Sequence, residues 1–88
     1  MKLIFCPACH DVVKCTFVFR TCQCGKSWGK YIDMYEVEVG GRTIVLGLDN
    51  NDLLQGLRSI PKEGKGPSVR AWVFAQKSDK IRKITSSD

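Results

Sequence analysis

Residues 11–20 carry an alternating pattern of apolar and polar side chains. The apolar positions are Val13, Cys15, Phe17 and Phe19. Because successive side chains of a strand point to opposite faces, this period of two predicts a strand with one buried face. A shorter strand is expected over residues 2–5, and each of the two is followed by a turn that contains two cysteines.

Two further strands are predicted around a pair of glycines. Residues 35–39 alternate between apolar and acidic positions, and an apolar pattern resumes at residues 42–48 after Gly40-Gly41. Adjacent glycines accept the positive φ angles of a type I′ turn. The segment therefore predicts an antiparallel hairpin with its acidic side chains toward solvent.

One short helix and a last strand follow the expected hairpin. Leucines and an isoleucine recur at helical spacing after three candidate N-cap residues at 49–51, which predicts a helix over about residues 51–59. The glycines and prolines of residues 61–67 predict a surface loop. Residues 68–76 are then expected to form a strand that buries Trp72 and Phe74.

Size and composition fit a single folded domain. The chain has 88 residues, of which 43% are hydrophobic and 26% charged, a balance that separates it from disordered proteins. We expect residues 1–76 to form one domain, with its metal-binding part in about residues 1–30. Residues 77–88 are polar and basic and are expected to fray.

Four of the five cysteines fall into two closely spaced pairs. The first lies in Cys6-Pro7-Ala8-Cys9, and the second in Cys22-Gln23-Cys24-Gly25, one residue shorter than the usual C-x-x-C. Zinc favours four thiolates in a tetrahedron, and two tight turns that each present two sulfurs can supply them. The predicted metal ligands are Cys6, Cys9, Cys22 and Cys24, and the predicted cofactor is a structural Zn²⁺.

The redox state of the compartment decides whether closely spaced cysteines bind a metal or form disulfides. The first cysteine follows only five residues, where no signal peptide fits, and the apolar run at 44–48 is much shorter than the roughly 20 residues that cross a membrane. We therefore expect a cytoplasmic protein without membrane contact. In a reducing compartment closely spaced cysteines are metal ligands more often than disulfides.

The two cysteine motifs resemble the rubredoxin-like knuckles of zinc ribbons over about the first 30 residues. With K-S-W-G-K-Y at 26–31 and L-G-L-D-N at 46–50, the chain also resembles small uncharacterised zinc-ribbon proteins of bacteria and phages. The resemblance implies a fold and no activity. The expected fold class is mainly β with one short helix, in which a small zinc ribbon is extended by an antiparallel hairpin, the helix and a final strand.

Other interpretations of the cysteine region stay open. Cys9 and His10 complete a C-x-x-C-H motif for c-type haem, but that attachment would leave the second cysteine pair without a purpose. His10 and Cys15 are alternative ligands, and iron is an alternative metal for the same four sulfurs. The preferred interpretation leaves His10 exposed and places Cys15 in the apolar core as a small hydrophobe.

A site of four thiolates has no open position for water or substrate, so the predicted zinc is structural rather than catalytic. The sequence also shows no nucleophile–base pair and no phosphate-cradling glycine loop. We predict a non-enzymatic module, such as a small regulator or inhibitor of phage or bacterial type. It would dock on another protein, for example one that handles nucleic acid.

Charge is unevenly distributed along the chain. The formal total is +5, with +4 in residues 1–30, −4 in residues 31–52 and +5 in residues 53–88. Zinc bound to four thiolates would lower the total to about +3. The acidic middle segment favours docking on a protein, whereas the basic ends favour phosphate contacts.

Direct binding of DNA or RNA is the alternative function. Cations around an exposed aromatic ring neutralise phosphates while the ring stacks on a base. The candidate residues are Lys14, Arg20, Lys26, Trp28 and Lys30. A competing interpretation is that Trp28 only covers the metal turn. The sequence leaves the oligomeric state open.

Overall fold

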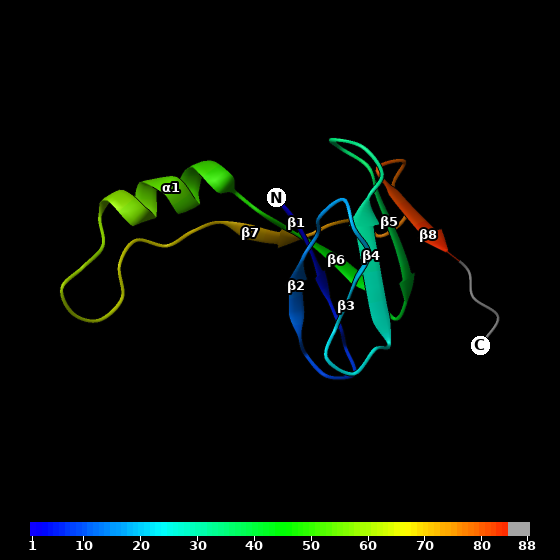
Figure 1. Cartoon of the computed structure of the whole chain (residues 1–88). Coiled ribbons are helices and arrows are strands. Elements are labelled where there is room, and N and C mark those ends of the chain that lie inside the picture. Colours follow the sequence, from blue (N-terminus) through cyan, green and yellow to red (C-terminus); the bar gives the residue numbers. More distant parts are fainter. Residues whose placement is uncertain (85–88) are drawn as a thin grey trace.

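The computed structural model describes residues 1–84 and contains two four-stranded sheets and one short helix (Figure 1). The first sheet has the strand order β2-β1-β6-β7, and the second sheet has the order β3-β4-β5-β8. The elements are β1 (Lys2–Phe5), β2 (Val12–Lys14), β3 (Arg20–Thr21), β4 (Ser27–Tyr31), β5 (Val37–Gly41), β6 (Ile44–Leu48), α1 (Asn50–Arg58), β7 (Ala71–Val73) and β8 (Ile81–Ile84). The prediction of a mainly β chain with one short helix is confirmed.

The two sheets face each other across a core of small and branched apolar side chains. Ile4 on β1 pairs with both Val13 and Val45 in the first sheet. The sheets approach closely at Gly29 on β4, where a Cβ atom would lie 3.4 Å from Cγ2 of Ile4. Burial of alternate side chains determines which side of each strand faces outward. The buried members of the core are Ile4, Cys6, Val13, Cys15, Cys22, Val37, Val39, Val45 and Ile81.

The chain crosses from one sheet to the other at Gly40-Gly41, where the sequence predicted a hairpin turn. β5 pairs with β4 and β6 pairs with β1, so the segments that flank the glycines lie in different sheets. An antiparallel hairpin is formed instead by β4 and β5. At the corner the Thr43 hydroxyl donates a 2.6 Å hydrogen bond to the carbonyl oxygen of Gly40, and Gly41 has a φ of +70°. The type I′ prediction is wrong because the two flanking strands lie in different sheets. The glycines are required instead by the backbone of this corner and by the indole of Trp28, which packs on them.

The alternating stretch at residues 11–20 forms less strand than its pattern predicted. β2 and β3 are short, and a turn joins them. The first two apolar positions are buried as expected, whereas Phe17 and Phe19 are 64% and 44% exposed. The turn is closed by Thr16, whose hydroxyl donates a 3.0 Å hydrogen bond to the carbonyl oxygen of Val18. This local bond competes with the strand pattern.

β8 lies in the segment whose polar, basic sequence predicted a frayed tail. Its first residue, Ile81, is 7% exposed and belongs to the core. The strand runs parallel to β5, and Arg82 forms ion pairs of 3.2 Å with Glu36 and 4.0 Å with Glu38. The prediction of a frayed tail is therefore wrong for residues 81–84. Residues 85–88 of that tail lie outside the described residues.

The helix and the loop after it project away from the two sheets (Figure 1). We call residues 49–70 the arm. α1 matches the predicted helix closely, and Asp49 caps it by accepting a 3.0 Å hydrogen bond from the backbone amide of Asp52. None of the nine helical residues is buried, and residues 61–67 are exposed, as expected of a surface loop.

Arg70 joins the two ends of the arm to each other at its base. Its guanidinium contacts the carboxylates of Asp52 at 2.8 Å and Asp49 at 2.9 Å. β7 follows directly and adds an edge strand to the first sheet. Phe74 is half-buried and contacts the core, but Trp72 is 42% exposed, so the prediction that both would be buried holds only in part.

Among residues 1–84, no helix combines the length and the apolar character that crossing a membrane requires.

Candidate metal centre

The first cysteine turn follows β1. The backbone amide of Cys6 donates to the carbonyl oxygen of Asp11 at 3.0 Å, and the amide of His10 donates to the carbonyl oxygen of Cys6 at 2.7 Å. His10 has a φ of +63°, a conformation that favours glycine. A histidine thus fills the left-handed position that follows the second cysteine of this turn.

The second cysteine turn connects β3 to β4. The amide of Cys22 donates to the carbonyl oxygen of Ser27 at 2.9 Å, and the amide of Gly25 donates to the carbonyl oxygen of Cys22 at 3.1 Å. Gly25 has a φ of +78°. The left-handed residue therefore comes directly after the second cysteine in both turns, although the second turn is one residue shorter.

The two turns bring the four predicted cysteine ligands together. Their sulfur atoms all lie within 4.8 Å of one another, and they are the described residues that could jointly hold a metal ion. The Sγ of Cys24 lies 3.6 Å from that of Cys6 and 3.5 Å from that of Cys22. Tetrahedral zinc with Zn–S bonds of about 2.3 Å requires sulfur–sulfur separations of about 3.8 Å. The sulfur arrangement therefore fits one tetrahedral metal ion.

The surroundings of Cys6 favour the ionised form of its thiol. The Ser27 hydroxyl has the largest effect, and with backbone amides of the first turn it outweighs burial and lowers the pKa of Cys6 to about 6. Ser27 is fully buried, and its hydroxyl has no well-formed hydrogen-bond partner among the described residues. The lowered pKa of Cys6 and the missing partner of the Ser27 hydroxyl have one explanation. The hydroxyl faces the sulfur of Cys6, which accepts a strong hydrogen bond only after it has ionised to a thiolate.

The pKa values of the second pair of thiols are shifted by neighbouring sulfurs and backbone amides. Burial acts to raise the pKa of Cys22, but the backbone amide of Ser27 and the thiol of Cys24 help to bring it below the usual value. For Cys24 the amide of Lys26 lowers the pKa, yet burial and the neighbouring thiols raise it to about 12. Four thiolates this close repel one another, so a bound cation is what allows all of them to ionise together.

The two other candidate ligands lie apart from this cluster. His10 is exposed, and its ring stacks on Phe5 with centroids 5.8 Å apart. Cys15 is 2% exposed, and burial raises the pKa of its thiol to about 11. Its burial in the core agrees with the preferred prediction for this residue.

The structure brings only some of the predicted nucleic-acid residues together. Lys14 belongs to β2 in the first sheet, whereas Arg20 is on β3, and Trp28 and Lys30 are on β4, all in the second sheet. Lys26 directly precedes β4. The indole of Trp28 lies over Gly40 and Gly41 of the adjacent strand.

Sequence reasoning missed two residues of these sites, Ser27 and Phe19. Ser27 follows the second cysteine turn, and its placement on the inner side of β4 could have been inferred from the alternation along that strand. Phe19 was assigned to the core, but its ring lies 4.7 Å from the ammonium nitrogen of Lys30 at the surface.

No protein-family model, curated protein or solved structure matches this chain.

Proposed function

We propose that this chain is a zinc-binding module of the zinc-ribbon type. The observation that supports it best is the convergence of four sulfurs from two separate turns at separations that suit one tetrahedral ion. Soft thiolate ligands favour zinc or iron, and iron is the competing metal for this site.

The metal acts as a structural cross-link in this proposal. Cys6 and Cys9 follow a strand of the first sheet, and Cys22 and Cys24 lie between two strands of the second sheet. One ion bound to both pairs joins the two sheets at the same end. Four thiolates complete its coordination shell, so it stabilises the fold and does not activate a substrate. The protein acts by binding rather than by catalysis.

Metal content tests this part of the proposal. The mass of the purified chain under native conditions should exceed its denatured mass by one zinc ion. Cobalt substitution should give the intense sulfur-to-metal absorption and the tetrahedral bands of a four-thiolate site. A chain that folds without metal, or that carries iron as purified, would overturn the zinc assignment.

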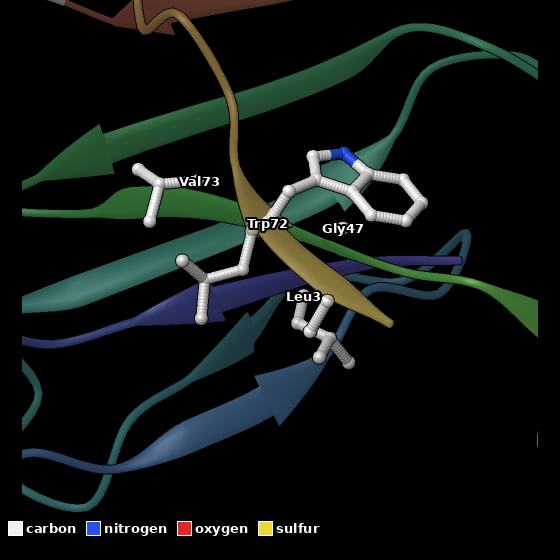
Figure 2. Close-up of a pocket in the computed structure, with 6 residues that line it drawn as sticks. Leu3, Gly47, Trp72 and Val73 are labelled. Atoms are coloured by element: carbon white, nitrogen blue, oxygen red, sulfur yellow. The ribbon is translucent and has the colours of Figure 1, made fainter. Parts of the chain in front are cut away.

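The partner in this proposal is another protein, for example one that handles nucleic acid, and the arm is the docking element. Leu54 and Leu57 are 54% and 56% exposed on a helix with no buried residue, and Ile60, just after the helix, is 70% exposed. Beside the arm an open hollow of about 240 Å³ lies over β1, β6 and β7 (Figure 2), where the indole of Trp72 covers Gly47. Its lining is almost wholly apolar and comprises Leu3, Leu46, Gly47, Ala71, Trp72 and Val73. Adjacent apolar surfaces of this kind mark interaction sites.

Site-specific photo-crosslinking tests the docking element. A photoreactive residue replaces Leu57 on the apolar side of α1, and in a matched chain it replaces the exposed, polar Arg58. In the source cells the first chain should crosslink to one protein that the second does not, and Leu54→Asp should abolish that product. Equal products from both positions would contradict docking through this helix, and a crosslink to a second copy would replace the partner with self-association.

The free thiols also support a reducing compartment. All five cysteines are unpaired with one another, and oxidation of the cluster to disulfides would destroy the metal site. We therefore propose a cytoplasmic location.

A further inference from the structure

We propose that the outward face of the second sheet binds single-stranded nucleic acid. This face, which we call the stacking face, carries Phe19, Trp28, Lys30 and Arg82. The inference rests on the zinc-held fold proposed above, because the second cysteine turn supports β3 and β4. It adds a ligand and a surface that lie apart from the arm.

Alternation along β4 determines which side chains reach the stacking face. Ser27 and Gly29 are buried toward the core, so Trp28 and Lys30 point the other way. Lys30 pairs with Glu38 on β5, and Glu38 pairs with Arg82 on β8. Cross-strand partners point to the same side, so these residues form one row across the sheet.

Trp28 is held flat against its own sheet by two glycines. A Cβ atom at Gly40 would lie 2.5 Å from the indole, and one at Gly41 would lie 2.7 Å from it. Any other residue at these positions would lift or displace the ring. The indole is nevertheless only half-buried. A ring packed onto backbone on one side keeps its other side available for a base.

A second ring lies in the row next to Trp28. Phe19 is 44% exposed, and the ammonium nitrogen of Lys30 lies 4.7 Å from its centroid. Thr21, two residues after Phe19, pairs with Trp28. Rows two residues apart along a strand are separated by about 6.8 Å, a spacing that successive bases of an extended single strand can match. Once the Lys30 ammonium moves from the face of Phe19 to a phosphate, the two rings can hold two neighbouring bases.

The charge around these rings is suited to phosphates. The backbone amide of Arg42 donates to the carbonyl oxygen of Lys26 at the Trp28 end of the sheet, which places two exposed cations there. The acidic groups of this face, Glu36 and Glu38, are both paired with Arg82. One guanidinium balances only one of these two carboxylates. The four cations Lys26, Lys30, Arg42 and Arg82 nevertheless exceed the two carboxylates by two charges, which complements a polyanion better than a neutral or basic protein surface.

Binding is tested with fluorescently labelled twelve-residue oligo-dT and oligo-rU and with the zinc-loaded full chain. Anisotropy should show binding at 50 mM salt and a loss of affinity of about tenfold or more at 200 mM salt, as expected for about three phosphate contacts. Duplex DNA should bind more weakly, because its bases cannot stack on the rings. No binding of either oligonucleotide at 50 mM salt, or stronger binding of the duplex, would overturn the proposal.

Matched variants locate the binding surface. Phe19→Ala should weaken binding about tenfold, since loss of base stacking costs about 1–3 kcal/mol. Phe17→Ala removes a more exposed ring elsewhere and should have no effect. Lys30→Gln should weaken binding and flatten the salt dependence, but Lys65→Gln in the arm should not. Equal effects within either pair would contradict the assignment to this face.

Fluorescence reports on Trp28 directly. Trp72→Phe leaves Trp28 as the single tryptophan, and oligo-dT should quench its emission if a base stacks on it. Zinc content measured on each sample separates the two proposals: loaded protein that does not bind refutes only the stacking face, and protein without zinc refutes the metal centre.

Discussion

The carboxylate of Asp11 accepts a 2.9 Å hydrogen bond from the backbone amide of Gln23. Asp11 follows the first cysteine turn, and Gln23 lies between the two cysteines of the second turn. The contact therefore ties the two halves of the metal site together independently of the ion. It also gives the shortened second pair a fixed position relative to the first.

Removing this tie should weaken the site. In Asp11→Ala the amide of Gln23 loses its partner, which costs about 1 kcal/mol and should lower zinc affinity about fivefold. Competition with a zinc chelator measures the change. Asp11→Asn is the matched control, because its amide oxygen can still accept the bond, and it should retain most of the affinity. Equal affinity in the alanine variant and the natural chain would show that the contact contributes nothing to metal binding.

Ser27 should make the site more resistant to acid. Its hydroxyl has the largest effect in lowering the pKa of Cys6 to about 6, and protons compete with metal for this sulfur. In Ser27→Ala the pKa of Cys6 should rise toward its usual value, so metal should be released at a higher pH and bound about tenfold more weakly at neutral pH. Cobalt absorption followed against pH measures both. An unchanged release curve would place the hydroxyl outside the site's chemistry.

The conformation of His10 predicts an asymmetric response to substitution. Its φ of +63° is a left-handed backbone conformation, which raises the conformational energy little for glycine but much for a β-branched residue. His10→Val should therefore lower the free energy of unfolding by about 1–2 kcal/mol, while His10→Gly should retain both metal and stability. Thermal unfolding of the two zinc-loaded variants provides the comparison. Loss of zinc from the glycine variant would instead indicate that the imidazole is a ligand.

Cys15 should make stability depend on pH in the alkaline range. Burial raises the pKa of its thiol from 9.0 to about 11, so the folded chain holds this proton more tightly than the unfolded chain. That contribution is complete below pH 9 and is lost as the pH rises through 11. The difference in unfolding free energy between the natural chain and Cys15→Ala should shrink over this interval. A difference that stays constant from pH 8 to 11 would contradict the effect of burial.

The features that the sequence predicted best depend on local chemistry. The helix was placed within one residue at either end because its N-cap and its apolar spacing are both local. The cysteine cluster was predicted from motif spacing, and the structure brings all four sulfurs together. Short turns and caps are encoded within a few residues, so one sequence is enough to find them.

The features that were predicted wrongly depend on distant partners. Gly40-Gly41 resembles a hairpin turn, but its glycines are needed by Trp28, which lies on a neighbouring strand. β8 pairs in parallel with β5, about forty residues earlier in the chain, and a polar sequence around Ile81 gave little sign of it. Such outcomes are decided by tertiary packing rather than by the period of the pattern.

The most direct test of the metal centre compares two cysteine substitutions in the same chain. Cys22→Ser removes one of the four clustered sulfurs, and Cys15→Ser changes the buried thiol that lies outside the cluster. Zinc content and the cooperativity of thermal unfolding are measured for both. We predict that Cys22→Ser loses zinc and cooperative unfolding together, whereas Cys15→Ser keeps one zinc per chain despite a lower melting temperature. A Cys22→Ser chain that still binds one zinc tightly and unfolds cooperatively would contradict the four-cysteine site.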